Sequence, residues 1–220
     1  ILQVLNQTGL EKDTLIFFTT DHGIGLPHIK MNLKDGGTGV ALIMRGPDGF
    51  RGGKVFDSLV THLDIFPTLC DLIGCNKPER IEGKSLLPLI NEETDEIHEA
   101  VYLEQHYHGK YAPLRAVRTK RFKYIRRYGE EKSMAYFSTD GGAAYDLLME
   151  HGYDERPYPE EQLYDLYFDP SECCNCIDDD FYQEYADQMR KLLDKWQKEK
   201  NDPILQGDID IPDSVIKRHI

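Results

Sequence analysis

Continuous apolar runs and short alternating runs occupy different halves of the chain. In the first half, residues 14–20 (TLIFFTT) and 40–44 (VALIM) are apolar throughout and rich in β-formers. Such runs are typical of strands that are covered on both faces of a mainly parallel sheet. Residues 23–39 between them are rich in Gly, Pro and Asn, which predicts a loop. Residues 1–10 and 64–73 show helical spacing and predict two short helices.

The pattern changes beyond the acidic segment 91–99 (NEETDEIHE), which we interpret as a boundary between subdomains. Residues 181–200 place aromatic and aliphatic side chains at helical spacing, which predicts an amphipathic helix packed on a sheet. The strands of that sheet are predicted from short β-like runs at 100–104, 115–119, 122–126 and 162–166. We therefore expect an α/β fold in two parts: an α/β part over residues 1–98, and a smaller antiparallel sheet with its packing helix over residues 99–220.

The overall charge restricts the kinds of partner. The chain has 26 Lys and Arg against 39 Asp and Glu, a formal net charge of −13. This charge argues against a nucleic-acid surface and against binding to anionic membranes. No apolar run reaches the roughly 18–20 residues that span a bilayer. An anionic substrate would need local cations that overcome the negative field.

Cysteine usage gives little support for a metal centre. An odd number of cysteines leaves one unpaired if the others bridge. The cluster CCNC has no second Cys or His cluster at zinc-like spacing, so we expect thiols or a local disulfide there. The five cysteines are Cys70, Cys75, Cys173, Cys174 and Cys176.

Candidate chemistry begins directly after the first apolar run, at Asp21 and His22. The carboxyl ends of strands are the ligand-binding edge of open α/β sheets. A carboxylate and an imidazole there can ligate a divalent cation, although Asp21 could equally cap a turn beside an exposed His22. Lys30 and Lys34 in the following loop could bind an anion held by the metal, or could be solvated surface lysines.

Several segments resemble the sulfatase family, in the family's order. Residues 13–23 (DTLIFFTTDHG) resemble the segment D-[NT]-T-L-[VI]-x-F-T-[ST]-D-[NH]-G. The short loop that follows resembles that of the heparan N-sulfatase subgroup most closely. Five further segments extend the similarity to about residue 200: VALIMRGP (40–47), HLDIFPTL (62–69), EGKSLLPL (82–89), RAVRT with Tyr124 (115–124), and LYDL with DPSE (163–172).

The resemblance implies roles for particular residues and a fold. It implies that the chain is the C-terminal part of an alkaline-phosphatase-like sandwich. Asp21 matches a calcium-ligating Asp, and His22 takes the neighbouring ligand position. Lys30 matches the basic residue that holds the sulfate in catalysis. His106 and His108 lie in a region that can reach the sugar in the family, the alternative being surface histidines.

The resemblance also implies what this chain lacks. The family nucleophile is a formylglycine made from Cys or Ser in a C/S-x-P-S-R motif, which does not occur here. We expect it upstream, with the Asp pair that completes the calcium site, so this chain alone is predicted to be inactive. The implied compartment is periplasmic, extracellular or lysosomal.

The intact protein is thus expected to hydrolyse sulfate esters or sulfamates on sulfated sugars such as glycosaminoglycans. Two alternatives remain open. The first is a phosphodiesterase or phosphonate hydrolase of the same superfamily, whose additional metal ligands would include His28. The second is a non-catalytic module. The sequence does not predict an oligomeric state.

Overall fold

The computed structural model describes residues 1–27, 29–50, 52–108, 110–129 and 142–210. Its internal contacts divide the chain into two compact units. Unit 1 contains Ile1–Thr20 and Ala41–Val101, and unit 2 contains Asp21–Val40 and Tyr102–Ile220. The loop that follows the first apolar run therefore belongs to unit 2, although both strands that flank it belong to unit 1. The assignment of residues 1–98 and 99–220 to two parts of an intact protein stays a prediction.

The helices of unit 1 lie where local signals predict them. Helix α1 (Leu2–Thr8) ends at Gly9, whose φ of 73° is the left-handed conformation of a helix C-cap. Helix α3 (Ile65–Ile73) likewise ends at Gly74, with φ 70°. Both helices were predicted and are confirmed. Shorter helical pieces are 3₁₀ turns at Leu10–Lys12, Asp48–Phe50 and His62–Asp64, and helix α4 (Leu87–Ile90).

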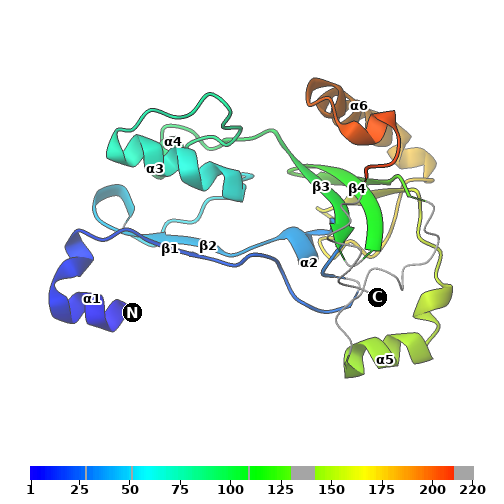
Figure 1. Cartoon of the computed structure of the whole chain (residues 1–220), viewed down its shortest axis with the longest axis horizontal. Coiled ribbons are helices and arrows are strands. Elements are labelled where there is room, and N and C mark those ends of the chain that lie inside the picture. Colours follow the sequence, from blue (N-terminus) through cyan, green and yellow to red (C-terminus); the bar gives the residue numbers. More distant parts are fainter. Residues whose placement is uncertain (28, 51, 109, 130–141, 211–220) are drawn as a thin grey trace. The chain divides into compact units, whose positions relative to one another are not determined.

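The two apolar runs form adjacent strands, but their direction differs from the prediction. Strand β1 (Ile16–Thr19) pairs antiparallel with β2 (Leu42–Arg45), so the prediction of a parallel arrangement is wrong for this pair. A parallel pair needs a crossover that returns to the starting end of the first strand. Here the chain leaves the end of β1, folds residues 21–40 into unit 2, and re-enters at the adjacent end of β2 (Figure 1).

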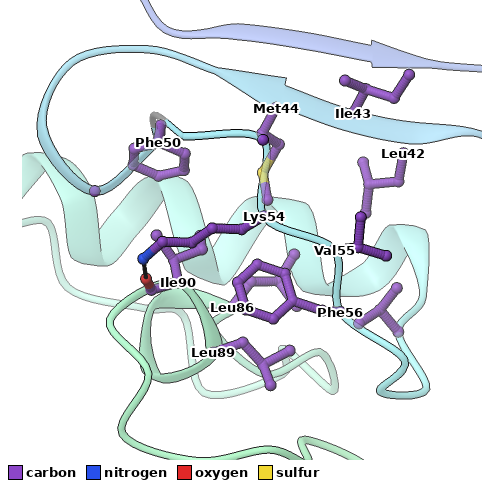
Figure 2. A pocket seen from close by; sticks show the side chains of 13 residues that line it. Leu42, Ile43, Met44, Phe50, Lys54, Val55, Phe56, Leu86, Leu89 and Ile90 are labelled. Carbon is purple, nitrogen blue, oxygen red and sulfur yellow. Dashed lines mark hydrogen bonds between the residues drawn. The ribbon is translucent and has the colours of Figure 1, made fainter.

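The strands of unit 1 are also less covered than predicted. Phe18 and Ile43 are 57% and 61% exposed. The other side of β2 packs its Leu42 and Met44 against the buried side chains of α4. Beside them lies an apolar hollow of about 490 Å³, lined by β2, residues 49–50, 53–56 and 60, and α4 with the preceding Leu86. Figure 2 shows Leu86, Leu89 and Ile90 on one side of it, with the Lys54 ammonium bonded to the Ile90 carbonyl.

Unit 2 is built on a four-stranded sheet in the order β3-β4-β5-β6. The pairs β4–β5 and β5–β6 are antiparallel, and a turn at residues 119–122 joins β4 to β5. The predicted antiparallel sheet is therefore confirmed, with β3 and β4 longer than expected. The strands are β3 (Ala100–His108), β4 (Lys110–Thr119), β5 (Phe122–Arg127) and β6 (Glu161–Asp165).

The two faces of this sheet are covered by different elements. Helix α6 (Gln183–Glu199) covers one face, as predicted for residues 181–200, and its Leu193 is fully buried (Figure 1). Tyr102 of β3 stacks on Trp196 of this helix, with ring centroids 5.1 Å apart. The segment 21–40 covers the other face, where Leu33 enters the core formed by β4, β5 and β6.

The remaining elements of unit 2 are short. Helix α2 (Asp35–Thr38) is a single turn inside the segment 21–40, which is otherwise irregular as predicted. Helix α5 (Ala143–Glu150) was not predicted. Further 3₁₀ turns lie at Tyr153–Glu155, Asp180–Tyr182 and Pro203–Gln206. No helix among the described residues is both long and apolar enough to cross a bilayer.

Candidate functional site

The loop that carries the candidate metal ligands is held in a compact shape by glycine-specific contacts. The Gly23 N–H donates to the Gly37 carbonyl at 2.9 Å, and the Ile24 N–H donates to the Gly36 carbonyl at 3.1 Å. A Cβ atom on Gly23 would lie 2.0 Å from the Gly36 oxygen, and one on Gly37 would lie 2.1 Å from the Ile29 oxygen. Backbones can approach this closely only where no Cβ intervenes. The loop therefore folds back on itself directly after its two candidate ligands.

Asp21 and His22 lie side by side at the start of this loop. The His22 Nδ1 lies 2.8 Å from the Gly23 carbonyl oxygen. A carbonyl only accepts hydrogen bonds, so Nδ1 carries a proton, and the lone pair of the neutral ring lies on Nε2. Nε2 lies 3.8 Å from the Asp21 Oδ1, and the Asp21 side chain is 91% exposed. An imidazole lone pair and an exposed carboxylate are thus available together.

This pair fits part of a divalent-cation site. Histidine ligands usually donate their second ring N–H to a carbonyl or carboxylate, as His22 does to Gly23. Calcium takes roughly six to eight ligands, mostly oxygen, so Asp21 and His22 would supply a minority of them. Across the described parts of the chain, no group of three or more His, Cys, Asp or Glu is arranged to hold a metal ion. The Asp21 carboxylate also accepts the His22 backbone N–H at 3.1 Å, which a local turn would equally produce.

The two candidate anion-binding lysines have different environments. Lys34 is buried, and its ammonium donates to the Glu172 carbonyl at 2.8 Å and lies 4.8 Å from the centre of the Tyr164 ring. Burial lowers the pKa of Lys34. Lys30 is half-buried, and its backbone N–H donates to the Leu26 carbonyl. The Lys34 ammonium is therefore committed to an internal contact, and the sulfate-binding role of Lys30 stays a prediction.

His106 lies on the face of the sheet that α6 covers, whereas the loop with Asp21 covers the opposite face. Its Nε2 is 2.6 Å from Nη2 of the fully buried Arg115, which also forms two 2.7 Å bonds with Asp202. Guanidinium nitrogens only donate, so His106 Nε2 accepts this bond and the ring N–H is on Nδ1. His108 ends β3, and its side chain is outside the described set. The substrate-binding roles of both histidines stay predictions.

The cysteines and His28 are the remaining candidate groups. All five cysteines are free thiols, so the local disulfide considered for residues 173–176 does not form. His28, the additional ligand of the phosphonate-hydrolase alternative, lies outside the described residues. None of the predicted site residues lines the apolar hollow of unit 1.

A group of largely buried charges between the loop and the sheet was not predicted. Asp35, at the start of α2, bonds to both Arg118 and Lys123 of the sheet. The sequence carried one signal for it: Lys123 interrupts the otherwise apolar start of β5, between Phe122 and Tyr124. A charge at such a position requires a buried partner, but nothing in the sequence identifies that partner as Asp35.

Comparison with known proteins shows which family this chain resembles in sequence and in structure. Residues 30–155 match the family described as N-sulphoglucosamine sulphohydrolase, C-terminal. An ulvan-active sulfatase of Formosa agariphila is 32% identical over 213 residues, covering 89% of this chain and 35% of that protein. The human N-sulphoglucosamine sulphohydrolase is 27% identical over 249 residues, covering 100% of this chain and 48% of that protein. The structure of a 2-O GAG sulfatase matches with a TM-score of 0.72 at 27% identity, covering 97% of this chain and 42% of that one.

The mixed α/β fold is therefore shared with the C-terminal portion of sulfatases. More particularly, the chain belongs to the N-sulphoglucosamine sulphohydrolase, C-terminal family, which confirms the resemblance seen in the motifs. It spans about a quarter to a half of the length of the curated relatives it matches.

Proposed function

We propose that this chain is the C-terminal part of a sulfatase that hydrolyses sulfate esters or sulfamates on sulfated sugars. The observation that carries the proposal is the pair Asp21 and His22. The exposed Asp21 carboxylate lies beside a lone pair that the Gly23 carbonyl fixes on His22 Nε2. The relatives add support, since they include sulfatases named for ulvan and for N-sulphoglucosamine.

The chain's own residues would perform three tasks. Asp21 and His22 would hold one side of a divalent cation, taken as calcium from the family resemblance. Such a cation supplies positive charge toward sulfate oxygens. Lys30 would place its ammonium on the sulfate group as a point charge, which stabilises negative charge that develops during S–O or S–N cleavage. The formylglycine nucleophile would come from an upstream part of the intact enzyme.

Local attraction by the cation and the Lys30 ammonium would also explain how a chain with a net charge of −13 binds an anionic substrate. Two cationic groups at one point outweigh dispersed surface carboxylates, because screening limits those to about 8–10 Å.

The reaction class can be tested with a panel of four aryl or sugar substrates on the intact enzyme that carries this chain. The panel contains a sulfate ester, a sulfamate, a phosphodiester and a phosphonate monoester, each assayed with added calcium. We expect turnover of the sulfate ester or the sulfamate to exceed that of both phosphorus substrates by orders of magnitude. Preference for the phosphodiester or phosphonate would reject the sulfatase proposal in favour of its superfamily alternative.

A further inference from the structure

Five charged side chains meet between the loop of unit 2 and its sheet, where the interior would normally be apolar. Lys123 and Glu172 are almost fully buried, Lys34 is buried, and Asp35 and Arg118 are partly exposed. The desolvation free energy of buried charges can exceed the free energy that their mutual attraction contributes. Replacing buried charged groups by apolar groups is therefore often neutral or stabilising. The better attested use of such groups is to fix one specific arrangement of the chain.

The centre of this charge network is Asp35. Its carboxylate accepts from Lys123 Nζ at 2.6 Å and from Arg118 Nε at 2.9 Å. Its backbone N–H donates to the Glu172 carboxylate. Burial alone would raise the pKa of Asp35, but the two cations outweigh burial and hold that pKa below its usual value. Four bonds from residues 83 or more positions away thus fix the first residue of α2.

A short series of hydrogen bonds connects Asp35 to the candidate ligands. The turn that Asp35 begins contains Gly36 and Gly37, whose carbonyls accept the N–H groups of Ile24 and Gly23. Gly23 in turn provides the carbonyl that fixes the His22 ring. A movement of α2 would therefore be transmitted to the ring through two backbone bonds.

We propose that Lys123, Arg118 and Glu172 are positioning residues for the sulfatase site, which act through Asp35 to set the place of Asp21 and His22. The proposal rests on the proposed function for its catalytic consequence. The mechanical link can be tested without that function, because the loop and the network lie within this chain.

The first test measures amide hydrogen exchange in the 220-residue chain. Lys123→Met removes the ammonium and keeps an unbranched apolar stem of the same number of atoms. We expect amide exchange at Gly23 and Ile24 to accelerate by roughly threefold to thirtyfold. This range corresponds to the coupling free energies that are typical between residues of one contact network. The matched control is Arg126→Met, which removes a different β5 cation that bonds to Asp194 of α6 on the other face. Exchange at Gly23 and Ile24 that rises no more in Lys123→Met than in Arg126→Met would overturn the link.

A milder variant covers the case in which Lys123→Met fails to fold. Arg118→Gln removes one of the two cations on Asp35, and Arg118 is partly exposed. It should accelerate exchange at the same two amides, and an unchanged rate there would also overturn the link.

The second test measures calcium affinity and kinetics in the intact enzyme. Lys123→Met should raise the calcium dissociation constant and lower kcat by about tenfold or more, with little change in KM, since a misplacement of about 1 Å can cost 10²-fold in rate. Arg126→Met should leave both quantities near wild type. Faster exchange with unchanged calcium affinity and kcat would overturn the positioning role. An intact enzyme that turns over no sulfate substrate even as wild type would instead refute the proposed function and leave the exchange result to decide the mechanical link.

Discussion

At the residue scale, the environment of Lys34 gives this lysine an internal contact, while the role of Lys30 stays a prediction. Both lysines lie in one loop, four residues apart, and either could have met an anion. The structure commits Lys34 to a buried contact with Glu172, while Lys30 precedes the buried stretch of residues 31–34. This difference could not be predicted, because it depends on a partner 138 residues away.

Replacing Lys30 should therefore separate sulfate binding from metal binding. In the intact enzyme, Lys30→Ala should slow turnover by about 10²–10³-fold, the usual loss for an oriented charge-stabilising donor. Its calcium content should not change. Lys120→Ala, at an exposed turn position, is the matched control and should retain full turnover. Turnover that falls with Lys34→Ala but not with Lys30→Ala would place the sulfate contact four residues later.

The glycines of the loop lead to a second prediction, on stability. Gly23→Ala should lower the free energy of unfolding of the 220-residue chain by about 1–3 kcal/mol or more, because the new Cβ would meet the Gly36 carbonyl oxygen at 2.0 Å. Gly25→Ala is the control, since a Cβ there would meet only His22 Cε1, at an ordinary 3.9 Å. Urea titration measures both variants. Equal stability of the two would contradict the described loop conformation.

At the scale of elements, local sequence signals predicted which helices and strands exist, and where they lie in the chain, better than they predicted strand direction. The helices were predicted because their caps and spacing are local, as with Gly9 at the end of α1. The direction of β1 relative to β2 was not, since an apolar run indicates burial and says nothing about the path of the connection. Strands β3 and β4 were predicted too short, because the polar residues Gln105 and His106 in β3 and Pro113 in β4 interrupt the pattern of β-forming residues.

Packing of α6 on the sheet gives a prediction with a large expected effect. Leu193 is fully buried, so Leu193→Ala should cost about 2–5 kcal/mol in the free energy of unfolding. Leu147→Ala in α5 is the same substitution at a 56% exposed helical position and should cost far less. Chemical denaturation of both variants checks this, and a small effect at Leu193 would argue against the described packing.

The contact between the β4–β5 turn and β6 predicts a dependence on pH. Asp165 is buried and accepts three hydrogen bonds from Arg121, which hold the pKa of Asp165 below its usual value. A depressed folded-state pKa gives stability that is present above the unfolded pKa and is lost as the pH falls through the folded pKa.

Asp165→Asn should therefore lower the free energy of unfolding at pH 7 by about 1–3 kcal/mol. The deficit relative to wild type should shrink as the pH falls below about 4. Asp187→Asn, an exposed partner of Arg190, is the control and should show little effect, as surface pairs contribute little. A deficit for Asp165→Asn that is constant from pH 3 to pH 7 would contradict the assignment.

At the scale of the whole molecule, the chain matches about a quarter to a half of the length of its relatives. Its described residues supply two candidate metal ligands, and its sequence contains no C/S-x-P-S-R motif. We therefore expect the purified 220-residue chain to show no turnover of an aryl sulfate or a sulfamate. Robust turnover by this chain, free of other enzymes, would show that the nucleophile lies within it.

The most direct test of the central claim is the calcium content and turnover of the Asp21→Ala variant in the intact enzyme. Both quantities should fall together, because Asp21 is proposed to hold the cation that faces the sulfate. Asp57→Ala removes an exposed carboxylate of unit 1 and should leave both quantities unchanged. Bound calcium at the wild-type level together with normal turnover in Asp21→Ala would contradict the account.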